Sequence, residues 1–449
     1  MRNAINLLLI CGCTLTGFAR EEYRRDFRKT VALAGGRSLR IENSNGKVNI
    51  RTQSKGEVEI VATIRCSAST ASEARSFAEQ IQIVIGDAGG VSVRTQYPNH
   101  YNSRDLSYGV DYDITMPETA PLELRNHFGT VTVANLHAPA TIASGNGSVY
   151  FSGGRGRQQI ENSFGDVEVR ANDGDLVVRN GNGAVIATDI SGTVDITDRF
   201  GRVRVTNAGR GVTIHSNNGE IEAANVGGPA SISNSFGTVT VTDARGDVIV
   251  QNQNGEVRAN GITGAAELHT SFNRVSFSHI GKTLTVRAAN ATIAGDTVGD
   301  SATVETSFGS VDLRGVKGGA RVTAGNSSIR LSGVGGEAYA KTSFNGVTVG
   351  DAAGPVTVEN QNGSVTVETR AGQKCQPISL HTSFGPIRVA IPGGTGYNVT
   401  ARTTFGRIHS EADMTVTGDI GGDELRGKIS GGGCEMRLTD QNGSIDIVK

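Results

Sequence analysis

Several residue types are scarce in this 449-residue chain. Tryptophan is absent and aromatic side chains make up only 5% of the residues, so Val, Ile and Ala must supply most of the core. The formal net charge is -1, which argues against a nucleic-acid-binding protein with a basic face. Only 9 prolines accompany 61 glycines, and this combination indicates many tight turns between short strands.

Long hydrophobic runs are also missing, since the apolar stretch at the amino end is too short for a comfortable membrane span. That stretch follows Arg2 and ends near Gly17-Phe18-Ala19, which predicts a signal peptide over residues 1–19 with cleavage before Arg20. The string Ile10-Cys11-Gly12-Cys13 resembles an imperfect lipobox, so a lipid anchor at Cys13 is the alternative. Either route predicts export to the periplasm, the outer membrane or the cell surface.

Cysteine is scarce as well. Cleavage after Ala19 leaves Cys66, Cys375 and Cys434, an odd number that allows one internal disulfide at most. Cys375 with Cys434 is the more plausible pair because both lie in an irregular carboxyl-terminal region, and three free thiols are the alternative. No CxxC motif occurs, so neither a redox site nor a zinc knuckle is indicated.

The chain repeats itself with great regularity. Phenylalanine recurs every 36 residues from Phe128 to Phe344, and asparagine lies midway from Asn146 to Asn362, so the true period is 18 residues. Three residues after each Phe or Asn comes Val or Ile, as at Val167, and a further pair of apolar positions follows nine residues later. Each unit therefore predicts two short strands with alternating inward and outward side chains.

One such unit cannot bury its own apolar face, so the units must stack. The sequence predicts an all-β fold: a parallel β-solenoid with 18-residue rungs over residues 127–370, right-handed by the general preference of parallel crossovers. A β-propeller is the main competitor, but its blades are about 40–50 residues long, and the constant half-period of nine fits stacked coils better.

The corners of the rungs carry two recurrent features. Asn-Gly and Phe-Gly place a residue that tolerates positive φ where the chain turns. A polar residue lies two positions before most of these Phe and Asn residues, and its amide or hydroxyl is expected to hydrogen-bond up the stack. We interpret the corners as stabilising ladders, and a stripe of Phe that serves as a binding surface is the alternative. The polar residues are Asn126, Asn162, Asn180, Asp198, Asn234, Asn252, Thr270, Thr306, Thr342 and Asn360.

Both ends depart from the period. Residues 20–65 are expected to form the first rungs, and residues 66–126 a small α/β insertion or cap with a helix near Thr70 to Gln82. Residues 371–449 are expected to form irregular rungs and a second cap. Atypical ends suit a solenoid, because a bare terminal rung exposes an edge that must be blocked.

Several strings resemble a known family. Val110-Asp111-Tyr112-Asp113-Ile114-Thr115-Met116-Pro117, Phe128-Gly129-Thr130-Val131 and Gly427-Lys428-Ile429-Ser430-Gly431 are similar to the DUF4097 family of candidate adhesins and to the head domains called GIN. The resemblance covers most of residues 30–449. It implies an envelope-associated β-solenoid and supplies no catalytic residue.

Motifs for chemistry are weak. Calcium-binding nonapeptide repeats need a regular acidic corner, but Asp166, Glu220 and Glu256 are scattered. His215 and His269 lie three rungs apart, about 14 Å, which is too far for one metal ion. We therefore predict no catalytic, cofactor-binding or metal site.

The outward charges also vary without a pattern, unlike the clustered acids of polysaccharide lyases. The sequence predicts a non-enzymatic envelope protein, an adhesin or structural rod, which does not bind nucleic acid and whose partner is unknown, with an envelope polysaccharide or surface protein as candidates. The alternatives are a β-helix carbohydrate-active enzyme and a scaffold that polymerises through its ends.

Overall fold

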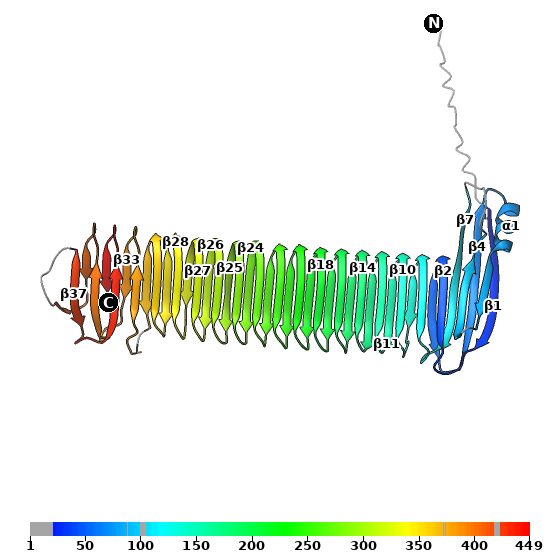
Figure 1. The fold of residues 1–449 in the computed structure, drawn as a ribbon, viewed down its shortest axis with the longest axis horizontal. Helices are drawn as coiled ribbons and strands as arrows, with labels where there is room; N and C mark the ends of the chain where they lie inside the picture. Colours follow the sequence, from blue (N-terminus) through cyan, green and yellow to red (C-terminus); the bar gives the residue numbers. More distant parts are fainter. Residues whose placement is uncertain (1–20, 88, 99–104, 371, 373, 417–422) are drawn as a thin grey trace, which may run out of the picture.

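The computed structural model is a long rod of stacked coils (Figure 1) and describes residues 21–87, 89–98, 105–370, 372, 374–416 and 423–449. The expected signal peptide, 1–19, and the expected lipid anchor, Cys13, lie outside these residues. All 39 strands in the described part of the chain belong to one sheet that winds around the rod. The predicted parallel β-solenoid is confirmed, and its handedness stays a prediction.

The middle of the rod follows the 18-residue period. Each strand pairs in parallel with the equivalent strand one period away, so that Val167 lies between Val149 and Val185. In four consecutive rungs both strands run through the corner as one long strand, β24 to β27. These elements are β8 (Leu122–Phe128), β9 (Val131–Ala134), β10 (Ala140–Asn146), β11 (Val149–Arg155), β12 (Gln158–Phe164), β13 (Val167–Asp173), β14 (Leu176–Asn182), β15 (Val185–Ile190), β16 (Val194–Phe200), β17 (Val203–Ala208), β18 (Val212–Asn218), β19 (Ile221–Val226), β20 (Ala230–Phe236), β21 (Val239–Ala244), β22 (Val248–Asn254), β23 (Val257–Ile262), β24 (Ala266–Ile280), β25 (Leu284–Val298), β26 (Ala302–Val316), β27 (Ala320–Ser332), β28 (Ala338–Phe344), β29 (Val347–Ala352), β30 (Val356–Asn362) and β31 (Val365–Thr369).

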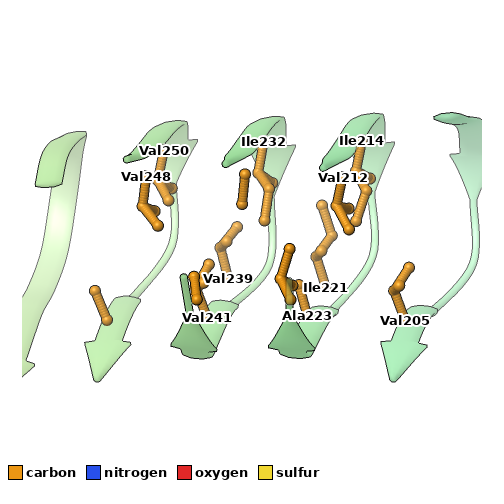
Figure 2. Packing of buried hydrophobic residues seen from close by; sticks show 14 of the residues in the cluster. Val205, Val212, Ile214, Ile221, Ala223, Ile232, Val239, Val241, Val248 and Val250 are labelled. Carbon is orange, nitrogen blue, oxygen red and sulfur yellow. The ribbon is translucent and has the colours of Figure 1, made fainter. Parts of the chain in front are cut away.

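The core is a narrow stack of aliphatic side chains between the two strands of each rung. Val212 and Ile214 of β18 point toward Ile221 and Ala223 of β19, and all four are almost completely buried (Figure 2). Because the next rung repeats the arrangement, the apolar side chains form a continuous column that no single rung could bury alone.

The amino-terminal region corrects the expectation that residues 20–65 form the first rungs. Only β2 (Ser38–Asn45) and β3 (Val48–Gln53) form a rung, which pairs with β8 and β9. The flanking strands β1 (Glu21–Ala32) and β4 (Glu57–Ala68) pair antiparallel with each other, because they belong to the cap that closes this end.

The rest of the cap comes from the predicted insertion. It consists of helix α1 (Ala71–Gln80), β5 (Gln82–Gly86), β6 (Gly90–Gln96) and β7 (Ser107–Pro117). The Thr70 side chain accepts a hydrogen bond from the backbone N–H of Glu73, which caps the helix. Strands β6 and β7 pair with β2 and β3, so the β2–β3 rung lies between β6–β7 and β8–β9. No helix in the described residues has the length and apolar character needed to cross a membrane.

The carboxyl-terminal rungs are also interleaved. They comprise β32 (Ile378–His381), β33 (Ile387–Ala390), β34 (Tyr397–Arg402), β35 (Ile408–Ser410), β36 (Met414–Val416), β37 (Glu424–Ile429), β38 (Cys434–Thr439) and β39 (Ile445–Val448). The last strands of the chain, β38 and β39, lie between β32–β33 and β34–β35. Antiparallel strands β37 and β36 then cover the outer edge of β34.

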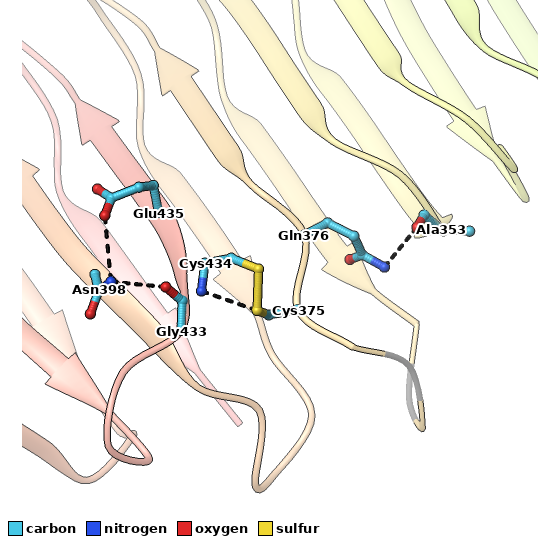
Figure 3. Close-up of a disulfide and its surroundings, with 7 residues drawn as sticks. All are labelled: Ala353, Cys375, Gln376, Asn398, Gly433, Cys434 and Glu435. Atoms are coloured by element: carbon cyan, nitrogen blue, oxygen red, sulfur yellow. Dashed lines mark hydrogen bonds between the residues drawn. A yellow bond between two sulfur atoms is a disulfide. The ribbon is translucent and has the colours of Figure 1, made fainter.

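A disulfide joins Cys375 to Cys434 near this end, which confirms the expected pair (Figure 3). It links the loop before β32 to the start of β38, and Cys66 remains a buried free thiol. Beside it, Gln376 Nε2 donates to the carbonyl of Ala353 at 2.9 Å, and Asn398 Nδ2 donates to the carbonyl of Gly433 at 2.8 Å. The disulfide thus ties the interleaved strand β38 to the loop that follows the last regular rung.

Candidate functional site

The most regular surface feature is a column of alternating phenylalanine and asparagine at one corner of the rungs. Phe164 pairs in register with Asn146 on one side and with Asn182 on the other, as the 18-residue period predicts. We call this set the Phe/Asn column. In spatial order it contains Asn45, Phe128, Asn146, Phe164, Asn182, Phe200, Asn218, Phe236, Asn254, Phe272, Asn290, Phe308, Asn326, Phe344, Asn362, Phe384, Asn442 and Phe405.

The rings of the column are exposed. Eight of its phenylalanines, Phe128 through Phe384, each show 49–54% of their surface to solvent, and Phe405 shows 78%. Phe77, Phe151 and Phe277, by contrast, are at most 5% exposed. Nine of the 14 phenylalanines therefore lie on one line at the surface of a rod whose core is aliphatic.

Backbone hydrogen bonds hold the column in register. The N–H of Gly147 donates to the carbonyl of Phe164 at 2.8 Å, and the N–H of Gly165 donates to the carbonyl of Asn182 at 2.8 Å. Gly165 has φ of 117°, and a Cβ there would lie 2.6 Å from the carbonyl oxygen of Gly147. Glycine is required at this corner because the backbones of successive rungs approach so closely.

A buried polar position lies two residues before each column residue in most rungs, and we call this set the inner ladder. Its Asn and Thr members hydrogen-bond the corner backbone: Asn252 Nδ2 donates to the carbonyl of Gly237 at 2.9 Å, and Thr270 Oγ1 to that of Phe272 at 2.9 Å. The ladder therefore fixes the turn that carries each ring outward. Its members are Asn43, Asn126, Ser144, Asn162, Asn180, Asp198, Ser216, Asn234, Asn252, Thr270, Thr306, Thr342, Asn360, Thr382, Asp440 and Thr403.

This geometry refines the expectation of bonds running up the stack. Within the described residues, ladder amides bond one another in two places: Asn43 to Asn126 and Asn162 to Asn180, each at 3.2 Å. The other Asn and Thr members donate to corner carbonyls, which lie within reach of these side chains and would otherwise lose a partner on burial.

Two acids in the inner ladder are electrostatically unusual. Burial raises the pKa of Asp198 to about 6, against the opposing effects of the Asn180 amide and the backbone N–H of Arg199. Burial also raises the pKa of Asp440, although the backbone N–H groups of Asn442 and Gln441 oppose it. The carboxyl group takes the place that an amide or hydroxyl has in the other rungs.

Two surface hollows adjoin the Phe/Asn column. One, about 430 Å³, lies beside the centre of the rod and is lined by Gln253 and Ser271, which precede Asn254 and Phe272. The other, about 520 Å³, includes Asn45, Phe128 and the half-exposed Tyr108 of the cap. The column is therefore flanked by concave surface at its middle and at its amino-terminal end.

A third hollow, about 610 Å³, lies on the second strands of the rungs, away from the column. It contains two carboxylates, Asp296 and Asp312. Asp312 accepts two hydrogen bonds from Arg314, at 3.1 and 2.7 Å, and is held in an ion pair. Other outward charges pair between neighbouring rungs, as Arg204 does with Glu222 at 2.9 Å.

The acids and histidines singled out in the sequence also have protein partners or lie apart. Asp166 accepts from the backbone N–H of Ala184 at 2.8 Å, and Glu220 pairs with Arg202 at 2.7 Å. Glu256 pairs with Arg258 at 2.6 Å, whereas His269 contacts Glu267 at 2.8 Å. No group of three or more metal-ligating side chains occurs in the part of the chain that the structure describes.

At the opposite corner of the rungs the backbone is left-handed at one position in most rungs, which was not predicted from the sequence. Residues every 18 positions adopt φ of 53–69° there, and most are Asn, Asp or Gly. Asn225 Nδ2 donates to Asn207 Oδ1 at 3.0 Å, and Asn207 Nδ2 to Asp189 Oδ1 at 2.7 Å. The recurrence of Asn and Asp at this spacing was the available signal.

Comparisons with known proteins give little further information. No family model matches the chain, and no curated protein is similar to it in sequence at a significant level. A solved structure of a candidate cell adhesion protein from Clostridium sporogenes aligns over 95% of this chain and 99% of its own, with 10% identity and a TM-score of 0.17. A candidate adhesin from Bacteroides fragilis aligns over 83% and 98%, with 10% identity and a TM-score of 0.15. Similarity at this level does not establish a shared function, and membership of the DUF4097 family stays a prediction.

Proposed function

We propose that this protein is an exported, non-enzymatic rod of the cell envelope that binds its partner along its length, as an adhesin or interaction protein does. The observation that carries the proposal is the Phe/Asn column, which repeats one exposed chemical pattern over about 80 Å. An extended array suits a long or repetitive partner, whereas a small-molecule ligand is usually enclosed in a single pocket.

Export is supported by the chemistry of the cysteines. The Cys375–Cys434 disulfide suits an oxidising compartment, since cytosolic thiols are kept reduced. Expression of the full chain in a bacterial host, followed by mass spectrometry of the amino end, tests this part. Cleavage before Arg20 or a lipid on Cys13 supports export, and an intact Met1 in the cytoplasmic fraction contradicts it.

Binding is tested with the purified chain from Arg20 onward, screened against envelope polysaccharides and envelope proteins. We expect saturable binding to at least one component. A folded rod that binds none of them would contradict the proposal.

Two other functions have weaker support. A carbohydrate-active enzyme needs two free carboxylates at its site, but in the hollow of about 610 Å³ Asp312 is engaged by Arg314. Release of reducing ends from polysaccharides, abolished by Asp296→Asn, would favour the enzyme. End-to-end polymerisation needs accessible parallel edges, whereas an antiparallel strand lies over part of each end. We therefore expect a light-scattering mass that stays constant as the protein concentration is raised.

A further inference from the structure

The Phe/Asn column has a chemical pattern that identifies a class of partner. We propose that it binds a neutral, extended β-1,4-linked polysaccharide laid parallel to the rod, one disaccharide for every two rungs; this rests on the proposed function and names its partner.

The first argument is spacing. Successive rings are separated by two rungs, which is about 9.6 Å. A β-1,4-linked glycan in its two-fold extended form presents the same sugar face at every second residue, and a disaccharide covers nearly this length. The apolar C–H face of alternate sugars can therefore stack on consecutive rings, such as Phe236 and Phe272.

The second argument is the chemistry between the rings. The side-chain amides of Asn146, Asn182, Asn218, Asn254, Asn290 and Asn326 make no hydrogen bond to protein among the described residues. An amide offers both donors and an acceptor, which is what a sugar hydroxyl needs. Rings for C–H faces thus alternate with amides for hydroxyls.

The third argument is electrostatic. The residues directly before the column are mostly Ser, Gly and Gln, including Ser235, Gln253 and Ser271, and a polar hollow of about 430 Å³ adjoins them. The two basic groups in that hollow, His269 and Arg287, both contact Glu267. Both basic side chains of this hollow are therefore paired with an acid, which weakens their attraction for an anionic polymer or a nucleic acid.

The fourth argument separates a glycan from a protein partner. Protein interfaces are built around a contiguous, well-packed apolar centre. Here each half-exposed ring is followed by an amide, so that no two rings are neighbours.

The fifth argument comes from the ends of the rod. Asn45 precedes Phe128 in space although 83 residues separate them in sequence. Asn442 lies between Phe384 and Phe405 although it follows both in the chain. Duplication of a 36-residue unit cannot produce this order, so the alternation is a property required of the folded surface.

The test uses the chain from Arg20 onward with insoluble β-1,4-glucan, insoluble β-1,4-linked N-acetylglucosamine polymer, and their soluble oligosaccharides. We expect co-sedimentation with at least one polymer and an affinity that rises with oligosaccharide length. We expect no binding to the curved α-1,4-glucan. Failure to bind either β-1,4 polymer overturns the inference, and binding to another envelope component in that case leaves the proposed function standing.

Substitutions test the column itself. Phe236→Asn with Phe272→Asn places in these rungs the residue that the column already accepts, and we expect at least a tenfold loss of affinity. The matched control, Tyr150→Asn with Ile249→Asn, removes exposed apolar side chains outside the column and should leave affinity unchanged. Equal losses in both variants overturn the proposal.

A second variant tests whether binding requires the alternation of rings and amides or only exposed apolar surface. Asn254→Phe with Asn290→Phe places a ring on consecutive rungs, and we expect weaker glycan binding because the amides are lost. Tighter binding would identify an apolar partner. A dimer in sedimentation that disappears in the Phe236→Asn, Phe272→Asn variant would identify a second copy of the chain. Either result would overturn the proposal that the partner is a glycan.

Discussion

Between β8 and β31 each rung lies on the rung that precedes it in sequence, whereas at both ends rungs from distant parts of the chain are interleaved. The β2–β3 rung is inserted beside β8–β9, and β38–β39 is inserted between β32–β33 and β34–β35. The Phe/Asn alternation nevertheless continues through both regions. The Phe/Asn alternation is therefore maintained between neighbours in space, even where neighbouring rungs are not consecutive in the sequence.

We expect the largest effect when rungs are deleted, because the regular region should tolerate a deletion and the interleaved end should not. Removing residues 201–236 joins Phe200 to Gly237 and keeps both register and alternation, so we expect a folded rod shorter by two rungs, about 9.6 Å. Truncation after Gly433 removes β38 and β39, which lie between β32–β33 and β34–β35, together with the Cys434 half of the disulfide, and we expect that end to unfold and aggregate. X-ray scattering and hydrogen exchange check both outcomes. A stable truncated end would contradict the importance of interleaving.

Removing the disulfide should weaken one end only. Cys375→Ser with Cys434→Ser opens a link across 59 residues, and we expect a loss of about 2–4 kcal/mol in the local unfolding free energy. Rungs contact only their neighbours, so exchange in β12 to β20 should not change. Hydrogen exchange with and without a reductant measures this, and a uniform loss along the rod would show that the rod unfolds as one unit.

The buried acids of the inner ladder make the stability of the two regions depend on pH. Because the pKa of Asp198 is raised to about 6 in the fold, the folded state binds more protons than the unfolded chain above pH 4. Stability should therefore fall as pH rises from about 4 to above 6. Asp198→Asn should abolish this fall and stabilise the protein at pH 7 by up to about 3 kcal/mol.

Asp440→Asn should act in the same direction, but on the carboxyl-terminal rungs alone, because burial also raises the pKa of Asp440. Chemical unfolding as a function of pH checks both variants. An unchanged pH profile in Asp198→Asn would refute the assignment to the ladder acid.

The smallest expected effect concerns ion pairs on the surface. Arg204 pairs with Glu222 at 2.9 Å in the regular region, and Arg402 pairs with Glu424 at 3.1 Å near the end. All four side chains are substantially exposed, so Arg204→Gln and Arg402→Gln should each cost roughly 0.2–1 kcal/mol and less at high salt. A larger cost in either variant, measured by chemical unfolding, would indicate a structural role beyond the pair.

The candidate site was only partly predictable. The period from Phe128 to Asn362 predicts that rings and amides alternate, but the polar ladder of Asn252 and Thr270 supports the corners through backbone carbonyls, which pattern alone does not identify. A sequence signal for the interleaving did exist. No Asn-Gly pair lies between Phe384 and Phe405, and Asn442-Gly443 supplies the missing rung.

By itself, the sequence determined that this chain is a stack of 18-residue rungs, because identical spacing of apolar residues leaves one way to bury them. Only the tertiary structure decided which rungs are neighbours at the ends and that the rings point to solvent. A parallel strand can pair with any equivalent strand edge. Which rungs become neighbours at an end therefore depends on which edges are still unpaired, and only the folded rod determines those edges.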